Sequence, residues 1–213
     1  MHVRRRIRPG LLVLAFALFA GSAAAQPQAG REFNRIATAA PPSTGSRIEV
    51  TEFFYYGCPV CYETEPLLSR WLATAPEYVS VRRVPALVTE VGEPFARLYY
   101  ALESLGEIER LHWPIYDNFH FDGIALNDEK IMADWVARNG IDRQKFLQTY
   151  ASAEIASRVA QARELLRARD IRGVPTFVVD GKFVTSARLA GGTKQVVEVL
   201  DHLVRRAREE RPQ

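Results

Sequence analysis

Phe53-Phe54-Tyr55-Tyr56-Gly57-Cys58-Pro59-Val60-Cys61-Tyr62 is the stretch that decides the fold, and it holds both cysteines of the 213-residue chain. Residues 47–54, at its start, are rich in β-branched and aromatic side chains, which is typical of a strand. After it, apolar residues at 67, 68, 71 and 72 have helical spacing. The cysteines therefore lie at a strand-to-helix turn, with Cys58 at the start of the helix. Pro59 suits the first helical position, where the N–H that proline lacks has no partner anyway.

Three interpretations of the Cys58/Cys61 pair compete. As a structural staple, a disulfide that closes so short a loop removes only about 1.9 kcal/mol of unfolded-state freedom. As half of a zinc site, it lacks a second ligand pair, which His112, His120 and His202 do not supply by their spacing. As a redox dithiol, Cys58 would meet the unpaired N–H groups and positive dipole of a helix N-terminus, which lower a thiol's pKa. Cys61, one turn on, could close the disulfide, and we favour this interpretation.

Residues 1–25 have the pattern of an export signal. Four arginines within residues 1–8 precede an apolar segment, Leu11 to Ala20, that is too short to span a bilayer, and Ala23-Ala24-Ala25 offers a cleavage site. Cleavage after Ala25 would leave 24 basic and 25 acidic side chains, a net charge of −1. The chain's basic character thus belongs to the signal, so nucleic acid is not an expected partner. Export would place the thiols in an oxidising compartment.

Residues 26–213 predict one α/β domain that is interrupted by a helical insertion. Residues 78–85 alternate as a second strand, and a strand–helix–strand of this length predicts two parallel strands. From about residue 90 to 170 the apolar spacing is helical. Residues 171–184 predict a β-hairpin, and residues 194–208 a final amphipathic helix.

Four smaller expectations concern local features. A short edge strand is expected near residues 33–36, and the hairpin is expected to turn at Asp180-Gly181. We expect His112 and His120 to be packed or surface side chains rather than ligands. We expect the charges of residues 205–211 to belong to a solvated helix end.

This order of elements resembles a thioredoxin fold with a helical insertion, and more specifically the DsbA family of periplasmic thiol:disulfide oxidoreductases. Three features carry the resemblance. Glu52-Phe53-Phe54 leads into the Cys-Pro-x-Cys-Tyr of residues 58–62. Arg172-Gly173-Val174-Pro175 precedes a strand, and the helical block lies between the two motifs.

The resemblance implies roles for four residues of these motifs. Cys58 would be the nucleophile that forms the mixed disulfide, and Cys61 the buried partner, with a Cys58–Cys61 disulfide in the oxidised enzyme. Pro175 would be a cis proline opposite the disulfide. Val174 would offer backbone hydrogen bonds to an extended substrate.

Four further residues would tune the redox chemistry: Pro59 and Val60 between the cysteines, and Glu52 and Arg83 as a buried charged pair beneath them. One position departs from the best-known members of the family, which have histidine where this chain has Val60. A nearby imidazolium that favours the thiolate is thereby lost. We therefore expect a weaker oxidant than the histidine-bearing relatives.

The resemblance implies an enzyme that introduces disulfides into exported proteins with free cysteines, in the periplasm. A quinone-linked membrane protein resembling DsbB would reoxidise it. No metal or organic cofactor is implied, because the electrons move through sulfur alone, and we expect a monomer. The alternatives are a disulfide reductase or isomerase, and a holdase that captures unfolded chains with a secondary dithiol. Isomerases of this superfamily usually have an N-terminal dimerisation domain, for which the short segment before the first strand leaves little room.

Overall fold

The computed structural model describes residues 26–37, 45–87 and 90–211, so the expected export signal at 1–25 lies outside the described residues. Its centre is a five-stranded sheet in the order β1-β5-β4-β2-β3. The strands are β1 (Asn34–Arg35), β2 (Ile48–Phe54), β3 (Val79–Pro85), β4 (Thr176–Val179) and β5 (Phe183–Ser186). As predicted, β2 and β3 are parallel, and α1 (Pro59–Thr74) connects them. The pairs β2/β4, β4/β5 and β1/β5 are antiparallel.

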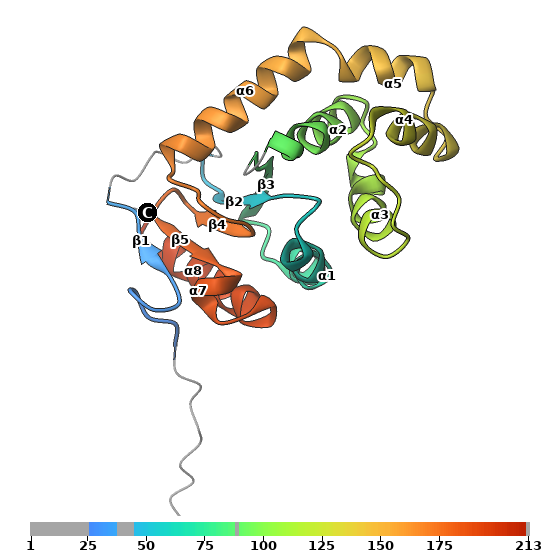
Figure 1. Ribbon diagram of the computed structural model, residues 1–213. Helices are drawn as coiled ribbons and strands as arrows, with labels where there is room; N and C mark the ends of the chain where they lie inside the picture. Colours follow the sequence, from blue (N-terminus) through green and yellow to red (C-terminus); the bar gives the residue numbers. More distant parts are fainter. Residues whose placement is uncertain (1–25, 38–44, 88–89, 212–213) are drawn as a thin grey trace, which may run out of the picture.

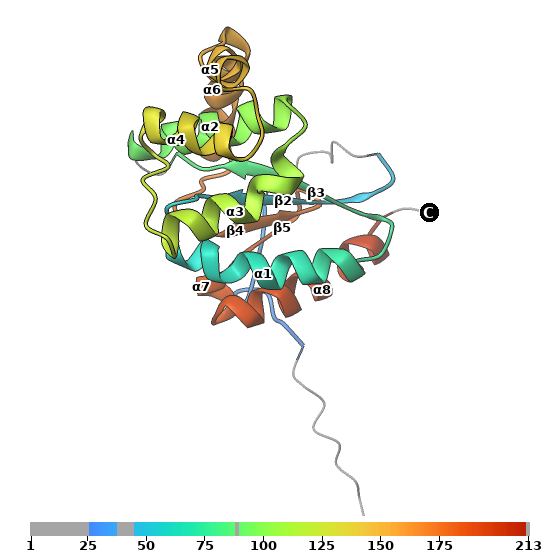
Figure 2. The same cartoon turned by 90° about the vertical axis from the view of Figure 1, so that its right-hand side faces the viewer.

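Helices cover both faces of this sheet (Figures 1 and 2). On one face lie α1, α8 (Thr193–Glu209) and the short α7 (Ala187–Ala190), which enclose a core with Val50 and Phe177. The other face carries the helices between β3 and β4, which follow a 3-10 turn at Glu90–Gly92. They are α2 (Glu93–Ser104), α3 (Ile108–His120), α4 (Glu129–Arg138), α5 (Arg143–Tyr150) and α6 (Ala153–Ala168).

β2 lies between β4 and β3 in the sheet, and side chains of the helices cover both of its faces. All of its residues except Glu49 are buried, including the polar Thr51 and Glu52 that stand between its apolar side chains. The segment after β2 packs into the second core, where Phe54, Tyr56 and Cys61 meet apolar side chains of the helical block. The cysteine pair therefore lies between the sheet and the helices α2 and α3.

The two parallel strands and the final helix lie within one residue of the ranges that the sequence predicts. The edge strand near residues 33–36 is the two-residue β1, and the hairpin turns where Asp180 (φ 53°) and Gly181 (φ 64°) both have positive φ. The 3-10 turn and α7 were not anticipated. Among the described residues, no helix has the length and apolar character needed to cross a membrane.

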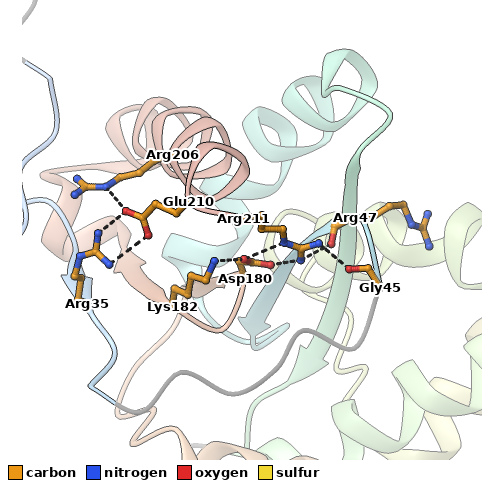
Figure 3. Close-up of polar contacts among 8 residues, drawn as sticks. All are labelled: Arg35, Gly45, Arg47, Asp180, Lys182, Arg206, Glu210 and Arg211. Carbon is orange, nitrogen blue, oxygen red and sulfur yellow. Dashed lines mark hydrogen bonds and ion pairs between the residues drawn. The ribbon is translucent and has the colours of Figure 1, made fainter. Parts of the chain in front are cut away.

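The expectation of a solvated C-terminal helix end was wrong for Arg211. Arg211, whose side chain is only 14% exposed, forms an ion pair with the buried Asp180 and donates hydrogen bonds to the carbonyls of Gly45 (2.7 Å) and Arg47 (2.8 Å). Figure 3 shows this group beside a second one, in which Glu210 pairs with Arg35 and Arg206. The charges anchor the end of the chain to the β4–β5 turn and to the start of β2.

Replacing Arg211 by alanine should destabilise the protein. Asp180 would stay buried with Lys182 (2.9 Å) as its remaining ion-pair partner, and two carbonyls would lose a donor. We expect the free energy of unfolding to fall by about 1–3 kcal/mol, the cost of leaving buried charged groups short of partners. The control is Arg205→Ala, which removes an exposed pair with Asp201 and should cost less than about 1 kcal/mol. Equal losses in denaturant titrations would refute the anchoring role.

Candidate active site

Cys58 caps the N-terminus of α1 with its sulfur. Its backbone is extended (φ −91°, ψ 117°), and its Sγ accepts a hydrogen bond from the Cys61 N–H at 3.3 Å. Pro59 occupies the first turn, as predicted from the missing N–H. Ahead of the helix, the Cys58 N–H donates to the Tyr55 carbonyl at 3.0 Å, which closes a turn. Sulfur thus takes the position that a hydroxyl or carboxylate oxygen usually fills at a helix start.

The two thiols have very different environments. Cys58 is half-buried, Cys61 is buried, and both are free thiols in this structure. Hydrogen bonds from the Cys61 thiol and from the backbone N–H groups of Cys61 and Val60 lower the pKa of Cys58 to about 6, although partial burial opposes them. Burial, followed by the interaction with Cys58, raises the pKa of Cys61 far above its ordinary value. At neutral pH the reduced pair therefore consists of a thiolate at Cys58 and a thiol at Cys61.

The segment before β4 lies directly opposite Cys58. The Val174–Pro175 peptide bond is cis, as the resemblance implied, and Cys58 Sγ lies 3.6 Å from the Val174 carbonyl oxygen, to which it donates when it is protonated. These residues are 116 positions apart in the sequence. They meet because β4 pairs with β2, with Thr176 opposite Phe53 at the end from which the cysteine segment leaves the sheet.

A groove of about 1150 Å³ runs beside these residues. Val60, 40% exposed, and Glu63 form one wall from α1. The remaining lining comes from Asn34 of β1, from the segment that contains the cis proline and from the β5–α8 region, namely Arg169 to Thr176, Val184 to Leu189 and Gly191 to Thr193. An extended chain bound there would pass within reach of Cys58.

A buried cluster of charges lies beneath the cysteines. Glu52 and Arg83 face each other in the register of the parallel strands β2 and β3, and Arg83 Nε donates to Glu52 Oε2 at 3.2 Å. The same guanidinium donates to Glu65 Oε1 of α1 at 3.1 Å. His112 Nε2 of α3 lies 3.5 Å from the other Glu65 oxygen, and His112 Nδ1 lies 2.7 Å from the Tyr56 hydroxyl.

This cluster contains two carboxylates and one guanidinium, so one extra proton is favoured. Burial, and then the neighbouring Glu65, raise the pKa of Glu52 to about 8, against the opposing effect of Arg83. Burial also acts on Glu65, but His112, Arg83 and Ser69 outweigh it and lower its pKa. Burial lowers the pKa of His112. The proton therefore resides on Glu52 at neutral pH, and Glu65 carries the negative charge, while Arg83 donates hydrogen bonds to both.

Sequence reasoning found Glu52 and Arg83 but not Glu65, His112 or Tyr56. Glu65 follows Cys61 by four residues and so shares its face of α1, which was the available signal. The packed state expected for His112 is correct, but its polar partners lie on α1 and after β2 and gave no sequence signal. In the described parts of the chain, no group of three or more His, Cys, Asp or Glu side chains is placed to hold a metal ion.

Comparison with known proteins places this geometry among thiol oxidoreductases. Residues 88–196 match the model of the DSBA-like thioredoxin domain, a span that contains Pro175 but starts after the cysteines. The chain is 38% identical over 179 residues to the thiol:disulfide interchange protein DsbA of Azotobacter vinelandii, covering 84% of each chain. It is 32% identical over 206 residues to the protein of that name from Pseudomonas aeruginosa, covering 97% of this chain and 98% of the relative.

Solved structures agree with the sequence relatives. The crystal structure of Pseudomonas aeruginosa DsbA superposes with a TM-score of 0.80 at 34% identity, over 86% of this chain and 95% of that one. The oxidoreductase DsbA of Xylella fastidiosa gives a TM-score of 0.80 at 28% identity, over 87% of this chain and all of that one.

Alkylation of the reduced protein should report the difference between the two thiols. Because the thiolate is the nucleophile, the rate of reaction with iodoacetamide should rise through pH about 6 and then level off. Mass mapping after a brief reaction at pH 6 should place the label on Cys58, and Cys58→Ser should abolish it. Labelling of Cys61, or a midpoint near the ordinary thiol value of about 8.5, would contradict the geometry.

Proposed function

The chain belongs to the DsbA family of disulfide-introducing thiol:disulfide oxidoreductases, and we propose from this that Cys58 and Cys61 are the pair that performs the exchange. The observation that carries the proposal is the position of Cys58 Sγ. It lies at the N-terminus of α1 and contacts the carbonyl before the cis proline at 3.6 Å. A thiolate formed there is both a good leaving group and accessible to an extended substrate.

In the oxidised enzyme Cys58 and Cys61 share a disulfide. A substrate thiolate attacks Cys58 Sγ, the Cys58–Cys61 bond breaks, and its electron pair leaves on the sulfur of Cys61. Because the pKa of Cys61 is raised, this sulfur takes up a proton and becomes a thiol. The substrate is then joined to Cys58 as a mixed disulfide.

A second substrate thiolate attacks the substrate sulfur of the mixed disulfide and expels Cys58. The lowered pKa of Cys58 makes it a good leaving group, since the thiolate is the species released. The substrate has lost two electrons and gained a disulfide, and the enzyme has become a reduced dithiol. Val174 would align the substrate by backbone hydrogen bonds next to Pro175 while this exchange proceeds.

The cellular setting follows the same proposal. Residues 1–25 direct export and are cleaved after Ala25, and residues 26–213 form a thioredoxin-like domain with a helical insertion at about 90–170. The mature chain acts in the periplasm as a monomer on exported proteins with free cysteines. A quinone-linked membrane protein resembling DsbB takes the electrons from the reduced pair.

A trapping experiment tests the assignment of roles. Cys61→Ser keeps the Cys58 thiol, which is first converted to a mixed disulfide with a small aromatic thiol. A thiolate of a reduced, unfolded substrate protein should then attack Cys58 Sγ and release the aromatic thiol. The substrate should then remain attached to Cys58 in non-reducing gels. The matched variant Cys58→Ser, treated in the same way, should trap much less. Equal trapping by both variants, or trapping through Cys61 alone, would reverse the roles.

Val60→His should make the protein a stronger oxidant. A partly cationic imidazole between the cysteines favours the Cys58 thiolate, which exists only in the reduced state, and so raises the reduction potential. The change should be greatest at low pH, where the imidazole is charged, and each tenfold change in the equilibrium constant with glutathione corresponds to about 30 mV. Val60→Asn, which adds a polar side chain without a charge, is the control. An unchanged or more reducing pair in Val60→His would show that residue 60 does not set the redox balance.

A further inference from the structure

The residue after the cysteine pair, Tyr62, is held between two rings of α3. The Tyr62 ring stacks on Trp113 (5.2 Å between centroids, 7° between planes) and on His120 (4.8 Å, 20°). Trp113 and His120 are two helical turns apart, about 10.5 Å along the axis, so one aromatic ring fills the space between them. The Tyr62 hydroxyl donates to Asp117 Oδ1, halfway between the two, at 3.0 Å.

His120 makes a second contact, with the segment before the cysteine pair. Its Nε2 lies 2.7 Å from the carbonyl oxygen of Tyr56. A carbonyl only accepts hydrogen bonds, so Nε2 carries the hydrogen and donates it. Tyr56 lies inside the turn that the Cys58 N–H closes on the Tyr55 carbonyl. One histidine of the helical block therefore touches the chain on both sides of the dithiol.

We propose that His120 is a positioning residue for Cys58, which fixes the turn before it through the Tyr56 carbonyl and is itself held in place by the Tyr62 ring. The proposal rests on the proposed function of Cys58. The Cys58 thiolate is stabilised only while the Cys58 backbone stays extended at the start of α1, because Sγ can then accept a hydrogen bond from the Cys61 N–H. A turn that is free to rotate would lose this geometry for part of the time.

Through the contact between His120 and the Tyr56 carbonyl, the helical block helps to position Cys58. His120 lies 64 residues beyond Tyr56, in a helix that supplies no atom to the groove beside Cys58. His112, on another face of α3, contacts the buried charge cluster instead. Its ring nitrogens lie close to Glu65 and to the Tyr56 hydroxyl. α3 thus holds Tyr56 at its carbonyl and at its side chain.

Two substitutions separate the hydrogen bond from the stacking. His120→Phe keeps a flat ring against Tyr62 but has no donor for the Tyr56 carbonyl, whereas His120→Gln keeps an N–H donor and loses the ring. The readouts are the Cys58 pKa, from the pH dependence of iodoacetamide reaction, and the equilibrium with glutathione. His120→Phe should raise the Cys58 pKa and make the pair about tenfold less oxidising, or about 30 mV lower in potential. His120→Gln should stay close to the wild type in both.

The matched control is His202→Phe, because the His202 ring also lies near an aromatic residue, Phe33 (6.1 Å), but on α8, in the other core. It should leave the Cys58 pKa and the glutathione equilibrium unchanged. Wild-type values for His120→Phe, or equal shifts in His120→Phe and His120→Gln, would overturn the proposal. If the wild-type pair does not exchange with glutathione at all, the proposed function fails instead, so the two failures are distinguishable.

A measurement on the wild-type protein keeps the proposal testable even if a variant does not fold. The ¹⁵N spectrum of the His120 imidazole should show hydrogen on Nε2 in the reduced protein, with slow exchange of that hydrogen with solvent. A neutral ring with its hydrogen on Nδ1 could not donate to Tyr56 and would overturn the proposal.

Discussion

The hydrogen bond from the Cys61 N–H to Cys58 Sγ is the interaction on which the chemistry of this protein depends. It gives the sulfur the role of a helix cap, and a negatively charged cap is favoured at the positive end of a helix. The surrounding elements maintain this geometry. β2 brings the chain to the start of α1, Pro59 begins the helix, and α3 holds the turn before Cys58. The charge that this geometry stabilises exists only in the reduced state, because only there is Cys58 a thiolate.

The buried charges beneath the dithiol illustrate a second constraint. Glu52 and Arg83 must face each other because β2 and β3 are parallel neighbours in a fixed register. Glu65 then competes for the same guanidinium, and burial makes two carboxylates beside one cation unfavourable. The cluster responds by keeping a proton on Glu52, whose pKa is raised to about 8. The site therefore stores a proton close to Cys61, the sulfur that must become a thiol during exchange.

The sequence predicted those features that depend on local spacing. The strand–helix–strand unit, the position of Cys58 at the helix start and the hairpin at Asp180-Gly181 all follow from periodicity and turn chemistry. The cis state of Pro175 came only from family resemblance, because local sequence does not distinguish it. Glu65 and His112 were missed since their pairing depends on how α1 and α3 pack. Arg211 was misjudged because a charge at a chain end is normally solvated, and only the tertiary fold brings the buried Asp180 beside it.

The most direct test of this account compares the stability of the two redox forms. If the fold stabilises the Cys58 thiolate, the reduced protein should have a larger free energy of unfolding than the oxidised protein. The pKa of Cys58 is about 6 when folded and that of an unfolded thiol about 8.5. The excess should therefore grow as the pH rises from about 6 towards about 8.5, and be lost as the pH falls through about 6. Above about pH 8.5 it should shrink again, because the raised pKa of Cys61 lets this thiol ionise in the unfolded chain but not in the folded one. An oxidised protein that is equally or more stable from pH 5 to 9 would contradict the account.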